Sequence, residues 1–292
     1  MGNSLREVKM RISSTQSTAQ ITKAMYMVSS SKGKKAEKTY RGYQDFMERI
    51  ERLIGLILSK AKEEDPHPLL RDRPIKTVAY LLITSDRGLA GSYNSSVYKT
   101  VEEQVKNDVK EGKKAIFGAI GKQGYAYLKR KGYPLIFDSP TLVRDDVMLV
   151  DILPLAKCLI DAYLEEKVDA VVLVFNHFIN RLQQSVELKP LLPVLPKTSE
   201  KDSIDYIFET GLEKTLQTVL PMYVEDLLYG MILDAKVCEH AARMNAMQSA
   251  TDNAEAIIEK LQLLYNRARQ AGITAELVDI IGGAGAIGGN NG

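Results

Sequence analysis

The sequence predicts an α/β fold in which long N- and C-terminal helices form an antiparallel coiled coil with an inserted Rossmann-like α/β domain. Three observations predict it. No proline precedes Pro66, the C-terminal segment repeats small or apolar residues at steps of three and four, and short apolar runs alternate with helical stripes between them. Such alternation of strands and helices is typical of a mostly parallel sheet.

The C-terminal segment reads as one helix from Leu212 to about Ile281. Alternating steps of three and four residues are the seam of a left-handed coiled coil. At ~1.5 Å per residue, this helix would be on the order of 100 Å long. Pro221 predicts a kink or a later start. The predicted seam residues are Met247, Ala250, Ala254, Ile257, Leu261, Leu264, Ala268, Ala271, Ala275 and Val278.

The N-terminal segment is the natural partner of this helix. Ser4 and Glu7 fit a capping box, so we expect a helix to begin there and to run to about Lys62. Its first seam residues are Leu5, Val8, Ile12, Thr15, Ala19 and Thr22, and farther along the predicted seam is Phe46, Ile50, Leu53 and Ile57.

Proline-rich stretches separate these helices from the central domain. Apolar runs predict strands at residues 78–84, 115–120, 135–137 and 168–175, with a further run in 180–195 whose prolines favour a sheet edge. Helices are expected between them, including one over 147–167 that Pro154 could kink or shorten. The predicted domains are a coiled-coil helix at 1–64, an α/β domain at 75–196 and a coiled-coil helix at 209–286.

Composition excludes several classes of protein. A net charge of +2 gives no general reason to expect nucleic-acid binding. Cys158 and Cys238 lack metal-ligand spacing and are expected to be free thiols in a reducing compartment. No stretch has the ~18 uncharged apolar residues of a membrane helix. We therefore expect a soluble, cytoplasmic chain.

The loop after the first predicted strand, residues 85–92, contains only Gly88 and Gly91 and matches neither common phosphate-binding motif. Asp86, Asp145 and Asp146 offer carboxylates, but no histidine lies near them in sequence. We therefore predict no catalytic residue, cofactor or metal site. The alternatives are a nucleotide-binding α/β module, or a coiled-coil scaffold that uses the basic run at 32–41 to bind an acidic partner or a nucleic acid.

Two uncharged surfaces are unusual for exposed helices. Residues 13–22 carry no charge, and residues 280–289 consist of Gly, Ala and Ile. The first is either a seam packed against a small neighbour or a surface that touches a partner without gripping it. The second is either a tip inserted into a socket or a frayed tail.

Several motifs resemble the gamma subunit of F-type rotary ATP synthases. They are residues 20–29 (QITKAMYMVS), 239–244 (EHAARM) with 246–247 and 250–254 (ATDNA), 265–277 (YNRARQAGITAEL), and 85–89 (SDRGL). The resemblance covers the whole chain in order. No dithiol insertion is present in the central region, so the thiol switch of chloroplast relatives is not expected.

The resemblance implies a non-catalytic rotor stalk on the cytoplasmic face of a bacterial membrane. Its coiled coil would stand inside three alpha and three beta subunits. Its α/β domain would lie beside the epsilon subunit and the ring of c subunits. Proton flow would turn the ring and the stalk, which would drive the beta subunits through states of different nucleotide affinity.

The resemblance also implies partner-contact residues. Arg243, Gln270 and Thr274 would hydrogen-bond a loop of one beta subunit. Tyr206 would rest on the c ring. Four more would face acidic loops at the base of the beta subunits: Lys23, Met25, Lys32 and Lys35.

Overall fold

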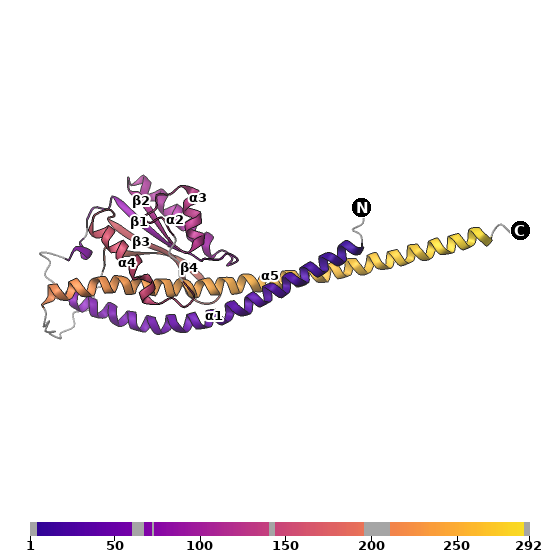
Figure 1. Cartoon of the computed structure of the whole chain (residues 1–292), viewed down its shortest axis with the longest axis horizontal. Coiled ribbons are helices and arrows are strands. Elements are labelled where there is room, and N and C mark those ends of the chain that lie inside the picture. Colours follow the sequence, from indigo (N-terminus) through magenta and orange to yellow (C-terminus); the bar gives the residue numbers. More distant parts are fainter. Residues whose placement is uncertain (1–4, 60–66, 72, 140–143, 196–210, 289–292) are drawn as a thin grey trace. The chain divides into compact units, whose positions relative to one another are not determined.

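The computed structural model describes residues 5–59, 67–71, 73–139, 144–195 and 211–288, the last six of these by their backbone alone. The first and last elements in the sequence are two long helices, and the remaining elements lie between them in the chain (Figure 1). The elements are α1 (Leu5–Ser59), a 3-10 turn (Pro68–Leu70), β1 (Thr77–Ile83), α2 (Tyr93–Lys110), β2 (Lys114–Ile120), α3 (Lys122–Lys131), α4 (Leu149–Leu164), β3 (Ala170–Phe178), β4 (Gln184–Leu192) and α5 (Leu212–Gly288).

These elements confirm the predicted fold class of long terminal helices with an inserted α/β domain. Their contacts separate the chain into two compact units. Unit 1 contains Met1–Val28 and Asn245–Gly292, and unit 2 contains Ser29–Met244. The division therefore falls within both long helices.

In unit 1, the ends of α1 and α5 pack through a narrow seam. Val8 and Thr22 are buried on α1, and Met247, Thr251 and Ala254 are buried on α5. The Thr22 and Thr251 hydroxyls lie 2.7 Å apart and share a hydrogen bond across the seam. The short side chains of Thr22, Thr251 and Ala254 let the two helices approach closely at this part of the seam.

The predicted seam of α5 is half right. Met247 and Ala254 are buried, whereas Ile257 and Leu264 are about half exposed, at 48% and 52%. At every second predicted position up to Ala271, the residue that follows it is more covered than the predicted one. These residues are Thr251, Ile258, Tyr265 and Gly272. Steps of three and four fit either set, so the position of α1 decides between them. Past Gly272, all side chains described up to Gly282 are exposed, including Ala275 and Val278.

In unit 2, the two long helices run antiparallel. The Tyr40 hydroxyl donates to Asp234 at 3.0 Å, and the Tyr43 hydroxyl donates to Asp226 at 2.8 Å. A later residue of α1 therefore contacts an earlier residue of α5.

The predicted seam of α1 in this unit is correct at Ile50 and Ile57 but wrong at Phe46 and Leu53, which are 44% and 45% exposed. Met47 and Ile54 take their places, because the seam continues in register from Val8.

The sheet of unit 2 has the order β2-β1-β3-β4. β1 is parallel to both β2 and β3, and β4 pairs antiparallel to β3 at the sheet edge, as its prolines predict. The predicted strand at residues 135–137 is wrong. Only Leu135 forms an isolated bridge, to Phe117, while the Phe137 ring covers Gly118.

Alternate residues of β1 face different layers, as expected for a buried strand. Ala79, Leu81 and Ile83 join the core formed with α4, α1 and α5. Val78, Tyr80 and Leu82 join the core beneath α2 and α3. One face of the sheet is therefore covered by α2 and α3, and the other by α4 and the long helices (Figure 1).

Both internal prolines are accommodated within helices. Pro154 lies inside α4 and Pro221 inside α5, which begins at Leu212. Among the helices of the described residues, none combines the length and the apolar character of a bilayer-spanning segment.

Candidate partner-contact site

The structure places the predicted contact residues in both units. In unit 1, Lys23, Gln270 and Thr274 are exposed, and Met25 is partly buried. The Thr274 hydroxyl donates to the carbonyl of Gln270 one turn earlier, at 2.9 Å. In unit 2, Lys32 and Lys35 are exposed and Arg243 is buried. Tyr206 lies outside the described residues.

Arg243 belongs to a buried ion cluster on one face of α5. Its Nη2 donates to the Glu239 carboxylate at 2.9 Å and to the carbonyl of Arg87 at 3.2 Å. The other Glu239 oxygen accepts from Lys236 at 3.1 Å. Spacings of three and four residues place these groups side by side on the helix. Since a buried charge is costly without a partner, Glu239 is what permits Arg243 to be buried.

Lys32 enters a second ion cluster, in which Asp145 joins α1 to α5. One Asp145 oxygen lies 2.6 Å from Lys32 Nζ, and the other lies 3.3 Å from His240 Nε2. Burial alone would raise the pKa of Asp145, but the hydrogen bond from Lys32 and the nearby positive charges lower it below its ordinary value. Asp145 is therefore held as a carboxylate that fixes the lysine side chain.

His240 is the most buried member of this cluster, with 3% of its side chain exposed. Burial lowers its pKa, against the opposing effects of Glu239 and Asp145. Its Nδ1 is buried and has no hydrogen-bond partner among the described residues. No histidine lies near Asp145 in sequence, but the fold brings His240, 95 positions away, to 3.3 Å from it, so the expectation that no histidine is placed to work with this carboxylate was wrong.

The crevice at the carboxyl ends of the parallel strands is filled by α5. In open α/β sheets, ligands bind beyond the carboxyl ends of two neighbouring strands whose following connections run to opposite sides of the sheet. In this sheet those two strands are β1 and β3. The Tyr93 hydroxyl after β1 donates to the carbonyl of Ala235 at 3.0 Å, and the Phe178 amide at the end of β3 donates to Asp234 at 2.8 Å. Because α5 packs against the segments that follow β1 and end β3, this geometry disfavours the nucleotide-binding alternative.

Sequence reasoning missed the residues that hold Arg243 and Lys32. Lys236, Glu239 and Arg243 carry a signal that could have been read, since charges three and four residues apart interrupt an otherwise apolar helix face. Asp145 carries no such signal, because a loop brings it to Lys32 and His240.

Comparison with known proteins gives a family match and several structural matches. A family model described as ATP synthase matches residues 4–287. A chain in the cryo-EM structure of the Tetrahymena thermophila mitochondrial ATP synthase central stalk and c-ring is 24% identical, with a TM-score of 0.59, over 79% of this chain and 99% of that chain.

Two Euglena gracilis mitochondrial ATP synthase structures also match. A chain of the OSCP/F1/c-ring structure in rotational state 3 is 17% identical, with a TM-score of 0.68, over 99% of this chain and 96% of that chain. A chain of the rotor structure in rotational state 1 is 16% identical, with a TM-score of 0.66, over 92% and 98%. At these identities the structures show a shared fold.

Proposed function

The chain belongs to the ATP synthase family, in which it is the non-catalytic gamma subunit, and from this premise we propose that it is the rotor of a bacterial proton-translocating complex. Rotation of a c ring would turn α1 and α5 inside three alpha and three beta subunits. The turning helices would favour a different conformation in each beta subunit and so change its affinity for nucleotide.

The exposed end of α5 is the observation that carries this proposal. Ile273, Leu277, Ile280 and Ile281 are between 51% and 70% exposed on successive turns of one helix. Large apolar side chains grouped in this way mark a surface that a partner covers. A sleeve of alpha and beta subunits would bury them on all sides of the helix.

The uncharged face of α1 supports rotation within that sleeve. The hydroxyls of Thr15, Ser17 and Thr18 donate to the carbonyls four residues earlier, at 2.8, 3.1 and 3.1 Å. With their protons turned to their own helix, these side chains offer a surrounding protein few strong hydrogen bonds and no ion pairs. Orientations of the helix would then differ little in energy.

Charged and polar side chains would transmit force to the beta subunits. Toward the described residues Arg243 donates through Nη2, to Glu239 and to the carbonyl of Arg87, so its other N–H groups would be left to donate to a loop of a beta subunit. Gln270 and Thr274 would contact the same loop from exposed positions. We propose that the acidic loops at the base of the beta subunits are faced by Lys23, Met25, Lys32 and Lys35.

The inserted domain would provide the base of the rotor. It would lie beside the epsilon subunit and on the c ring, which Tyr206 would contact from outside the described residues. The bacterial assignment rests on the resemblance of the terminal motifs, and the lack of a dithiol insertion separates the chain from chloroplast relatives alone. The chain would then be a peripheral protein on the cytoplasmic face of the cell membrane.

Reconstitution tests the proposal directly. The full chain is mixed with alpha and beta subunits, and complex size and ATP hydrolysis are measured. We expect a stable complex with one copy of this chain for three alpha–beta pairs, and a higher hydrolysis rate than without the chain. A chain that stays apart from the alpha–beta mixture would overturn the rotor assignment.

Variants then test the contact residues. Arg243→Ala should lower the hydrolysis rate about tenfold, because truncation of a buried charged contact is costly. Gln270→Ala should lower it without affecting the fold, since its side chain is exposed. Arg130→Ala, on the exposed surface of α3, is the matched control. Equal rates for Gln270→Ala and the control would contradict the assigned contact.

A further inference from the structure

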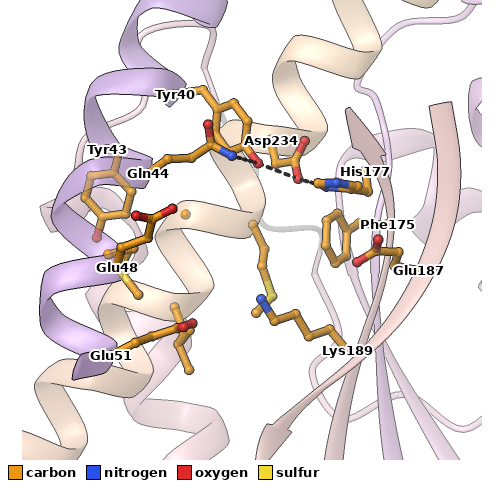
Figure 2. A pocket seen from close by; sticks show the side chains of 14 residues that line it. Tyr40, Tyr43, Gln44, Glu48, Glu51, Phe175, His177, Glu187, Lys189 and Asp234 are labelled. Atoms are coloured by element: carbon orange, nitrogen blue, oxygen red, sulfur yellow. Dashed lines mark hydrogen bonds and ion pairs between the residues drawn. The ribbon is translucent and has the colours of Figure 1, made fainter. Parts of the chain in front are cut away.

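A pocket of about 250 Å³ lies in unit 2 between α1, α5 and one face of β3 and β4 (Figure 2). Its lining comes from four elements that are far apart in sequence. The proposed rotor contacts are not among its residues. The pocket is therefore a separate feature whose purpose the rotor proposal leaves unexplained.

A hydrogen-bonded chain forms one wall of the pocket. Asp234 lies 2.6 Å from His177 Nδ1 and accepts from the Tyr40 hydroxyl at 3.0 Å. Gln44 in turn donates to that hydroxyl at 2.9 Å, and the Phe178 amide donates to the second Asp234 oxygen at 2.8 Å. Since these groups satisfy one another, they fix the shape of the wall and leave recognition to the other side chains.

Aromatic and thioether side chains give the pocket an apolar body. Tyr40 and Phe175 are buried, and Tyr43, Met47 and Met231 complete this part of the lining. Aromatic rings attract cations as well as alkyl groups, and methionine adapts to irregular ligands. Such a lining suits a short carbon chain that carries a positive charge.

Carboxylates dominate the charge of the pocket. Glu48 and Glu51 project from α1, and Glu187 faces them from β4 (Figure 2). Asp234 also lines the pocket but is paired with His177, so Lys189 is the one lysine or arginine of the lining that faces Glu48 and Glu187. No ion pair joins Glu48, Glu187 or Lys189 to another side chain of the described residues. The pocket therefore has a negative charge that its own residues leave partly uncompensated.

We propose that this pocket binds a small organic cation, an alkyl diamine, with its carbon chain against the aromatic wall and its ammonium groups near Glu48 and Glu187. A metal ion fits less well, because the described residues contain no group of three side chains placed to hold one. An anion would meet the carboxylates. A bound diamine would connect α1 to the sheet and stabilise the folded chain.

Calorimetric titration of the full chain with 1,4-diaminobutane tests this inference, with 1,4-butanediol as the uncharged analogue of equal length. The diamine should bind saturably with one molecule per chain and should raise the melting temperature. The diol should do neither. The absence of saturable diamine binding, or equal binding of the diol, would overturn the proposal. The result is independent of assembly with other subunits, so it leaves the rotor assignment unaffected.

Charge variants locate the binding. Glu48→Gln and Glu187→Gln should each weaken diamine binding about threefold, as for partly exposed ion pairs. Lys189→Met should strengthen it by a similar factor, because it removes a repelling charge. Glu259→Gln, on an exposed turn of α5 in unit 1, is the matched control. Affinities that are the same in all four variants would place the diamine elsewhere and overturn the proposal.

Discussion

At the scale of single residues, burial decides what the charged groups of α5 can do. His240 is nearly inaccessible and is held among Lys236, Glu239 and Arg243 of its own helix and Asp145 of a loop. Lys32, on α1, meets the same Asp145. Burial lowers the pKa of His240 more than the two carboxylates raise it. The histidine is therefore neutral in the folded chain at neutral pH.

This predicts a pH dependence of stability. The folded chain resists protonation of His240 at a pH where the unfolded chain accepts it, so the free energy of unfolding should fall as pH drops from 7.5 through about 6.5, the ordinary pKa. His240→Gln should show a shallower fall. Urea unfolding measures the free energy of unfolding of both proteins at several pH values. Subtracting one curve from the other cancels the contribution of titratable groups that both proteins share. Parallel curves would contradict the prediction.

At the scale of elements, helical spacing alone leaves the buried face of a long helix uncertain by one residue. The spacing of apolar residues predicts Leu53 for the seam of α1, but Leu53 is 45% exposed and Ile54 is 1% exposed. Both residues have large apolar side chains, and either one fits the steps of three and four residues along the seam. Packing of α1 against α5 and the domain core selects Ile54.

These neighbours provide a matched pair of variants. Ile54→Ala should lower the free energy of unfolding by about 2–5 kcal/mol, because it leaves a cavity in the core. Leu53→Ala should change it by less than about 1 kcal/mol, since Leu53 is 45% exposed and does not belong to the core cluster that contains Ile54. Chemical denaturation measures both. Equal losses would show that the seam does not run through Ile54.

At the scale of the whole molecule, the two units differ in how fully their helices are covered. In unit 2 both long helices contribute to the main core of the α/β domain. In unit 1, α5 continues past Gly272 with exposed side chains as far as Gly282. A helix without tertiary packing is only marginally stable in water.

Hydrogen exchange should therefore separate two parts of α5 in the isolated chain. Amides of residues 273–282 should exchange quickly, whereas those near the buried Met247, Thr251 and Ala254 should be protected. Assembly with alpha and beta subunits should slow exchange at 273–282 at least about tenfold, because the sleeve would bury that segment. Unchanged exchange on assembly would contradict insertion of this end.

The sequence by itself determined the long terminal helices, the β1, β2 and β3 strands, and the edge position of β4. It did so because helix and strand periodicities and proline restrictions act over a few residues. The strand expected at 135–137 failed because a short apolar run pairs only where a neighbouring strand is in reach, and Leu135 alone finds one. The family motifs also lie in continuous segments, so the rotor hypothesis was available from the sequence.

Only the tertiary structure decided which seam residues are buried, how Arg243 and Lys32 are held, and that α5 fills the crevice of the sheet. Each depends on the direction from which a distant segment approaches. Asp145 reaches both Lys32 and His240, and Tyr93 reaches Ala235, across more than 90 positions of sequence. Local periodicity does not predict these tertiary contacts, because it specifies which side of a helix or strand is apolar but not which segment packs against that side.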